Sequence, residues 1–140
     1  MNMKLTIVTP EKRILVGQEV DEVTVPAFKG ELNILPGHAP LITTLETGVM
    51  KWKLKGKEKQ DLAVISWGYC QVSPEGVNIL ANIADLPEDI DLQATKEFLA
   101  LSEKKIMNEL ITDEDWAEFQ RDWAHARAKI EAAEQQPAKK

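Results

Sequence analysis

The chain has 140 residues, of which 44% are hydrophobic and 29% are charged, and its formal net charge is −6 at pH 7. This composition predicts a folded protein of one domain, or a small domain with an appendage, and excludes a disordered chain. The acidic balance argues against nucleic acid as a partner, and the single cysteine, Cys70, excludes an intramolecular disulfide.

Two widely spaced histidines and one cysteine do not suit a structural zinc site. No apolar run approaches the roughly 20 residues needed to cross a bilayer, so we expect no direct membrane insertion. The N-terminus lacks a signal-peptide pattern, because lysine and Pro10 interrupt its short apolar stretch. We therefore expect a cytoplasmic protein that meets a membrane only through a partner.

Up to about Asp85, apolar residues alternate with polar ones, which predicts strands. Three β-prone pieces come first, separated by Pro10 and by Gly17–Gln18: Leu5–Thr9, Arg13–Val16 and Val20–Val25. Met50, Trp52 and Leu54 then alternate with three lysines. Two further candidates flank Trp67–Gly68, namely Asp61–Ile65 and Tyr69–Ser73, and a last alternating run follows the turn Ser73–Gly76. Many short strands joined by close turns are typical of a β-sandwich or barrel.

The stretch Gly30–Pro40, which reads GELNILPGHAP, concentrates turn-forming residues between two strand-like segments. Glu31 and His38 flank its ILPG core and are the polar groups that we expect this turn to present. Taken as residues alone, Glu31 is a solvated turn residue, and the imidazole of His38 hydrogen-bonds a backbone carbonyl.

After Leu86 the sequence changes to a helical pattern. The segment from Asp91 to Ile111 contains no glycine or proline and has Asp91 as its expected N-cap, while one apolar face holds Ala94, Phe98, Leu101 and Leu110. Thr112 is the expected cap of a second helix. Its residues Trp116, Phe119, Trp123, Ala126 and Ile130 form a heptad-like stripe, expected to pack against the first helix. We predict a β-sandwich over residues 1–86, an antiparallel two-helix hairpin over 87–136 and a disordered tail over 137–140.

Several motifs in this order resemble the epsilon subunit of bacterial F-type ATP synthases over nearly the whole chain. Besides GELNILPGHAP they are Thr9-Pro10, Thr47-Gly48, Ser66 to Gly68, and Pro87 to Asp91. The resemblance implies a non-catalytic subunit of the central stalk, bound peripherally at the cytoplasmic face of the bacterial membrane. In that family the sandwich binds the gamma subunit and the ring of c subunits, so that ion-driven rotation reaches the catalytic head.

The resemblance also implies an interface with the c-ring at Glu31, Leu35, Pro36, Gly37 and His38. There the carboxylate and imidazole can pair with polar groups of the ring. Asn33 stands where the family usually has glycine, and we expect asparagine to keep a left-handed backbone at this position. Trp67 stands where the family commonly has a small residue, and we expect it to be a core or edge aromatic.

In the epsilon family the hairpin can open, extend into the catalytic head formed by the alpha and beta subunits, and block ATP hydrolysis. Hairpin packing and a candidate regulatory face are expected at Phe98, Leu101, Trp116, Phe119, Trp123 and Ile130. Two features argue against strong inhibition by this chain: the stripe is very apolar for a hairpin that must open, and the region is acidic. The second helix offers cations at Arg121, Arg127 and Lys129.

Some family members bind ATP between the two domains through an Ile/Leu-Asp pair followed by arginine and alanine. This chain has Ile90-Asp91 but then Ala94 in place of the arginine, and Asp85 stands for an upstream carboxylate. We therefore expect a degenerate nucleotide site at Asp85, Asp91 and Ala94, and no cofactor or metal. No nucleophile with its base is recognisable, so we expect no catalysis. The alternatives are a nucleotide-sensing inhibitory regulator and a free-standing β-sandwich binding module.

Overall fold

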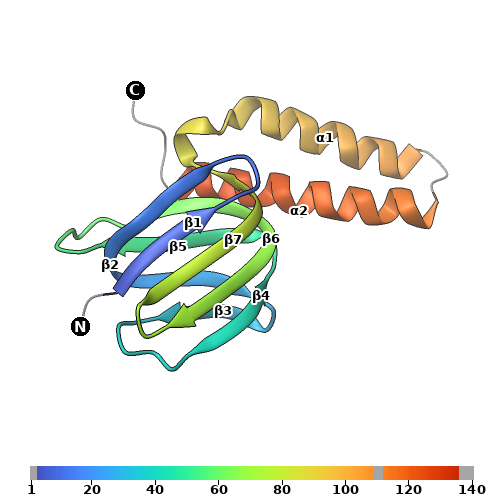
Figure 1. Ribbon diagram of the computed structural model, residues 1–140. Helices are drawn as coiled ribbons and strands as arrows, with labels where there is room; N and C mark the ends of the chain where they lie inside the picture. Colours follow the sequence, from blue (N-terminus) through green and yellow to red (C-terminus); the bar gives the residue numbers. More distant parts are fainter. Residues whose placement is uncertain (1–2, 109–111, 136–140) are drawn as a thin grey trace.

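The computed structural model describes residues 3–108 and 112–135, which form a β-sandwich followed by two helices (Figure 1). The strands are β1 (Met3–Val8), β2 (Arg13–Ala27), β3 (Gly30–Ile34), β4 (Leu41–Leu45), β5 (Gly48–Leu54), β6 (Asp61–Ser73) and β7 (Gly76–Asp85). A short 3₁₀ turn, η1 (Pro87–Asp89), leads into α1 (Leu92–Asn108) and α2 (Asp113–Gln135). The predicted fold class, a sandwich followed by a helical hairpin, is confirmed.

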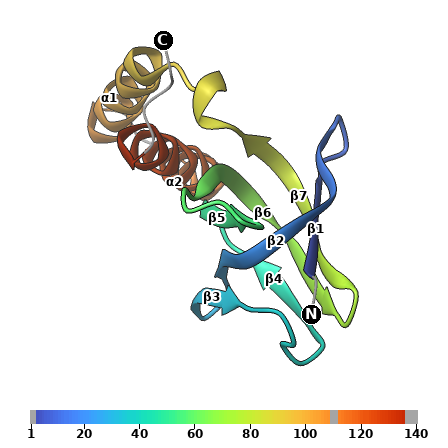
Figure 2. The same cartoon turned by 90° about the vertical axis from the view of Figure 1, so that its left-hand side faces the viewer.

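Hydrogen bonding joins all seven strands into one sheet that folds over on itself (Figure 2). The first strand closes the fold, because β1 pairs antiparallel with β2 and parallel with β7. Strand β7 pairs along its length with β6, and β5 bridges β6 to β2. Strands β3 and β4 extend the sheet at the end away from the helices. Both edges of the N-terminal strand are therefore covered.

The two longest strands correct the prediction of shorter pieces. Strand β2 runs continuously through Gly17, where the prediction placed a break. Gly17 has a φ of 61°, and its N–H donates to Thr6 Oγ1 at 3.0 Å, so the glycine forms an irregularity inside a continuous strand.

Strand β6 likewise runs through Trp67–Gly68 without interruption. The side chains that enter the core are Ala63 and Ile65 before this point and Cys70 and Val72 after it, so the alternation slips by one residue. The slip coincides with a change of neighbour, since β6 pairs with β5 up to Ile65 and with β4 from Gly68. One strand with two phases of alternation therefore looked like two strands.

The core lies between the two layers of the folded sheet. Its largest fully buried side chains are Leu5, Ile7, Ile34, Met50, Ile65 and Ile79. Met50 and Trp52 point inward, as the alternation with lysines predicted. Burial raises the pKa of the Cys70 thiol to about 11, because the thiolate would lose its hydration in the core.

Both helices begin at the predicted caps. The Asp91 carboxylate accepts a hydrogen bond from the backbone N–H of Ala94 at 3.0 Å. At the second helix, Thr112 Oγ1 accepts from the N–H of Asp115 at 3.1 Å, and Asp115 accepts in return from the N–H of Thr112. The predictions for Leu110, Ile111 and the tail over 137–140 lie outside the described residues. In the part of the chain that the structure describes, neither helix has the length and apolar character needed to span a membrane.

Candidate functional site

The turn that joins β3 to β4 lies at the end of the sandwich opposite the helices (Figures 1 and 2). Gly37 takes a φ of 89°, which favours glycine, and the backbone N–H of His38 donates to the carbonyl of Leu35 at 3.0 Å. His38 Nδ1 lies 2.8 Å from the carbonyl oxygen of Ala39. Because a carbonyl can only accept, Nδ1 carries the hydrogen and the other ring nitrogen remains for a different contact.

Glu31 belongs to strand β3, where it pairs with Pro26 of β2, and its side chain is exposed. The prediction of a left-handed backbone at Asn33 is wrong, since among the described residues positive φ is confined to glycines. Asn33 lies in the β2–β3 ladder opposite Thr24, and its Nδ2 donates to Thr24 Oγ1 at 2.9 Å. Strand pairing holds this position extended, so the special backbone of the loop falls on its glycines.

The turn borders a shallow recess of about 260 Å³. Leu35 and His38 line it on one side and Ser73 and Pro74, from the β6–β7 turn, on the other. Leu35 is 51% exposed, and Pro36 and Gly37 are exposed beside it. Leu35, Gly37 and His38 thus lie together at the free end of the sandwich, beside a second turn that the sequence did not point to, whereas Glu31 lies at the other end of strand β3, outside this recess.

A cluster of exposed apolar side chains occupies the outer face of the neighbouring strands. Ile42, Tyr69 and Leu80 are 72%, 55% and 55% exposed, and we call these three residues the β4–β6–β7 patch. Tyr69 pairs directly with Leu80 and with Thr44, so the three side chains come from adjacent strands and the same face. Sequence reasoning missed this patch. Its signal is that apolar residues occupy positions where an exposed sheet face normally carries polar ones.

The aromatic stripe of α2 is less buried than a core stripe. Trp116 and Trp123 are 44% and 38% exposed, and Phe119 stacks on Trp116 with ring centroids 5.6 Å apart. Trp123 reaches α1 through a hydrogen bond from its Nε1 to Glu103 Oε1 at 3.0 Å. On α1, Phe98 and Leu101 are 46% and 69% exposed, and with Phe119 they line a groove of about 400 Å³ between the helices.

A different face of α2 packs against the sandwich. Ala128 and Ala132 are buried against Leu62 and Val64 of β6, and Ile90 packs beside them. His125 and Lys129 lie on the same face, since positions 125, 128, 129 and 132 follow helical spacing. Sequence reasoning followed the larger aromatic residues and missed this face, although its spacing was visible.

A cleft of about 560 Å³ lies between part of the sandwich and the hairpin. Its lining includes Trp67, Asp91, Ala94, Phe98 and Arg121. Trp67 is 51% exposed and borders this cleft, so it is not the core aromatic that the sequence analysis expected among its alternatives.

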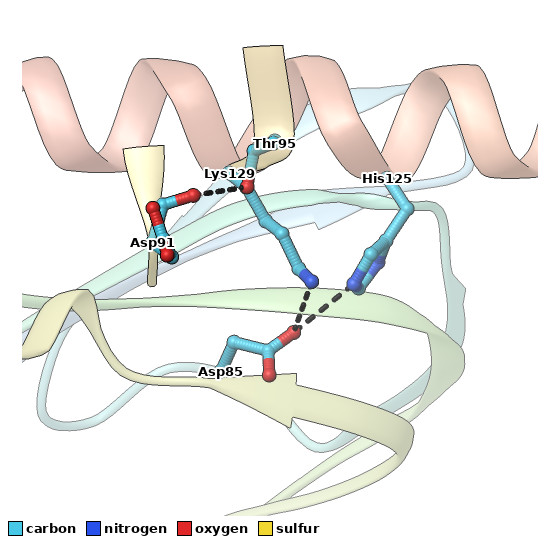
Figure 3. A network of polar contacts seen from close by, with 5 residues as sticks. All are labelled: Asp85, Asp91, Thr95, His125 and Lys129. Atoms are coloured by element: carbon cyan, nitrogen blue, oxygen red, sulfur yellow. Dashed lines mark hydrogen bonds and ion pairs between the residues drawn. The ribbon is translucent and has the colours of Figure 1, made fainter. Parts of the chain in front are cut away.

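Asp85, at the end of β7, lies beneath α2 and meets two of its side chains (Figure 3). The Nε2–H of His125 donates to Asp85 Oδ2 at 3.0 Å, and Lys129 Nζ lies 3.9 Å from the same oxygen. The hydrogen bond from His125 holds the pKa of the Asp85 carboxyl below its usual value. Desolvation opposes this lowering, and the charges of Lys129, His125 and Lys12 support it.

Comparison with known proteins places this architecture in a family. The model of the ATP synthase delta/epsilon chain β-sandwich domain matches residues 2–87. The chain belongs to the ATP synthase delta/epsilon family. Within it the similarity is to epsilon chains: the chain is 99% identical to the ATP synthase epsilon chain of Bdellovibrio bacteriovorus, with all of both chains covered. Epsilon chains are subunits of ATP synthase and do not carry its catalytic site.

More distant epsilon chains agree over most of the length. The ATP synthase epsilon chain 1 of Syntrophotalea carbinolica is 34% identical over 131 residues, covering 94% of this chain and 93% of the relative. That of Geobacter metallireducens is 42% identical over 101 residues, covering 72% of this chain and 71% of the relative.

A chain of a solved ATP synthase structure also shares the fold. A chain in the Euglena gracilis mitochondrial ATP synthase aligns with a TM-score of 0.82 at 24% identity, covering 94% of this chain and 81% of that chain. The fold is thus shared over 94% of this chain.

Proposed function

We propose that this chain is a central-stalk subunit of a bacterial F-type ATP synthase that couples rotation of the c-ring to the catalytic head through the gamma subunit. The observation that carries the proposal is the full-length identity of 99% with an ATP synthase epsilon chain. The role is mechanical: the chain transmits torque through protein contacts and forms or breaks no covalent bond. The subunit would lie peripherally at the cytoplasmic face of the membrane.

The ring-facing surface in this proposal is the β3–β4 turn with Glu31. Support comes from its position at the free end of the sandwich, remote from the hairpin. Glu31 can pair with a cation of the ring, and the ring nitrogen of His38 that is not engaged with Ala39 can meet a polar group. Leu35, in the same turn as His38, adds an exposed apolar contact.

The gamma-facing surface in this proposal is the β4–β6–β7 patch. An exposed cluster of two aliphatic side chains and a tyrosine is unusual on a sheet face unless a partner covers it. Tyrosine suits such a role because its ring packs while its hydroxyl bonds at the rim. The patch and the ring-facing turn lie on connected strands, so one rigid body would touch both partners.

Assembly of the complete enzyme tests the two surfaces separately. Leu80→Asp places a charge in the patch and should abolish co-purification with gamma, because an unpaired buried charge is costly. The double variant Glu31→Lys, His38→Glu should still bind gamma but lose ATP-driven ion pumping. Glu58→Lys, on the exposed β5–β6 turn, is the matched charge-reversal control and should behave as the parent. Full coupling in the double variant would refute the ring-facing assignment, and gamma binding by Leu80→Asp would refute the gamma-facing one.

A nucleotide-sensing role is the second candidate, and the cleft argues against it. Ala94 lines the cleft where the ATP-binding relatives have arginine, and Lys129 is engaged with Asp85. Asp91 uses one carboxylate oxygen to cap α1, and Asp89 and Asp122 place negative charge in the same lining as Arg121. We propose that the site is degenerate, so millimolar ATP should leave the melting temperature of the isolated protein unchanged. A rise with ATP concentration would reverse this assignment.

The charged residues of α2 argue against inhibition by an opened hairpin. Arg127 lies over the ring of Trp123 at 5.5 Å, and Lys129 faces Asp85, so two of the three cations named above on α2 are engaged within the chain. The helix also begins with three acidic residues. We expect thermolysin to give the same cleavage pattern with and without nucleotide. A free-standing binding module, the third reading, predicts no retention on immobilised gamma.

A further inference from the structure

The buried apolar side chains that α2 contributes to its contact with the sandwich are small. Of the two helices, α2 makes the main contacts with β5 and β6, and α1 packs on the outer side of α2 (Figures 1 and 2). The buried side chains that α2 contributes against β6 are two alanines, Ala128 and Ala132. An alanine buries one methyl group, so hydrophobic burial here is far weaker than in the core of the sandwich.

A polar contact stands beside these alanines. Asp85 Oδ2 receives the Nε2–H of His125 at 3.0 Å and faces Lys129 Nζ at 3.9 Å (Figure 3). The exposed fractions of the Asp85, His125 and Lys129 side chains are 25%, 18% and 30%, so water screens the contact only in part. Hydrogen bonds to a charged group in such surroundings are stronger than neutral ones.

This contact can form only while α2 is docked on the sandwich, because its residues come from both parts of the chain. Asp85 ends β7 and belongs to the sandwich, whereas both of its partners lie on α2, forty or more residues later. His125 and Lys129 are four residues apart, so both face Asp85 only while this side of α2 lies on the sandwich. If α2 moves away, Asp85 loses both partners at once.

We propose that Asp85, His125 and Lys129 form an intramolecular latch that holds α2 against the sandwich. Both partners of Asp85 are supplied by the chain itself. No ligand is needed to keep the hairpin docked. The latch does not depend on assembly into a complex, and the isolated full-length chain would have it.

The hydrogen bond of His125 shows which chemical group the latch requires. Its Nε2 carries the hydrogen that Asp85 accepts, while its Nδ1 is buried and has no hydrogen-bond partner among the described residues. The essential element is therefore one N–H donor at the Nε2 position. Glutamine can supply a donor from a similar distance along the helix side chain, and leucine cannot.

Amide hydrogen exchange on the full-length protein tests the latch. Asp85→Ala and His125→Leu should each accelerate exchange of the α2 amides between residues 124 and 134 by at least about fivefold, with β6 unchanged. His125→Gln should restore protection to within about twofold of the parent, since it keeps the donor. The double variant Asp85→Ala, His125→Leu should exchange no faster than the faster single variant, because both remove the same contact.

The control is Asp122→Asn, which removes a carboxylate from the same helix and the same cleft. It should exchange like the parent. Equal acceleration in Asp122→Asn would assign the effect to net charge and overturn the latch. Unchanged α2 exchange in His125→Leu, no rescue by His125→Gln, or additive effects in the double variant would each overturn it as well. If Asp85→Ala also loses protection in β6, the His125 variants, which leave the sandwich untouched, decide the outcome.

Discussion

Replacing Gly68 by alanine should destabilise the sandwich, although the change adds one methyl group. A Cβ built at Gly68 would lie 2.1 Å from the backbone oxygen of Leu80 and 2.9 Å from the Cα of Ala81. Both atoms belong to the backbone of β7, which pairs with β6 at this point. No side-chain rotation can relieve the contact, so the two strands must separate locally.

The expected loss of stability follows from the packing and the hydrogen bonds that local separation of β6 and β7 would disturb. Overpacking costs about 1–3 kcal/mol, and each weakened ladder hydrogen bond costs about 0.5–1.5 kcal/mol. Replacing glycine also lowers the conformational entropy of the unfolded chain, and this effect alone stabilises the protein by about 0.4–1 kcal/mol. We expect a net loss of about 2–4 kcal/mol in the free energy of unfolding, well above the effect of a typical surface substitution.

Urea unfolding followed by circular dichroism measures this loss. With a slope of about 1–3 kcal/mol per molar urea, a loss of about 2–4 kcal/mol should lower the midpoint by about 0.7–4 M. Gln71→Ala, an exposed position on the same strand, is the control and should stay within about 0.5 kcal/mol of the parent. A midpoint for Gly68→Ala that matches this control would show that β7 yields without cost and would refute the reasoning.

Three further outcomes follow from the packing and charges. Ile79→Ala should cost about 2–5 kcal/mol in urea unfolding, because Ile79 is fully buried. The pKa of Asp85 is lowered, so the contribution of its carboxylate to docking is fully present above the usual carboxyl pKa. That contribution is lost as the pH falls through the lowered pKa. An NMR titration should therefore find a lower pKa for Asp85 in the parent than in His125→Leu. Cys70, whose pKa is raised to about 11, should resist a thiol reagent at pH 8 until urea unfolds the chain.

Alternation predicted the sandwich because most strands bury one face and expose the other. It failed where one strand serves two neighbours. Strand β6 changes its partner from β5 to β4 between Ile65 and Gly68, and the buried phase slips there. A period-two pattern cannot distinguish such a slip from the end of a strand, so the sequence analysis predicted two strands where the structure has the single strand β6.

The helical half shows a different limit. Caps were predictable because Asp91 and Thr112 act on amides a few residues away. The face of α2 that docks on the sandwich was not predictable, because Ala128 and Ala132 are much less hydrophobic than the two tryptophans of the same helix. The contact between Asp85 and His125 joins residues forty positions apart, and local sequence cannot specify which turn of a helix will face a distant carboxylate.

The order of the two helices bears on how the chain is synthesised. On a ribosome, the sandwich emerges first and α1 follows, but α1 packs chiefly on α2, which is made last. Without α2, the 17-residue helix from Leu92 to Asn108 lacks the tertiary packing that supplies most of the stability of helices in proteins. Until α2 leaves the exit tunnel, the nascent chain therefore presents a finished sandwich followed by an unsupported α1, and chaperones would meet the chain in that form.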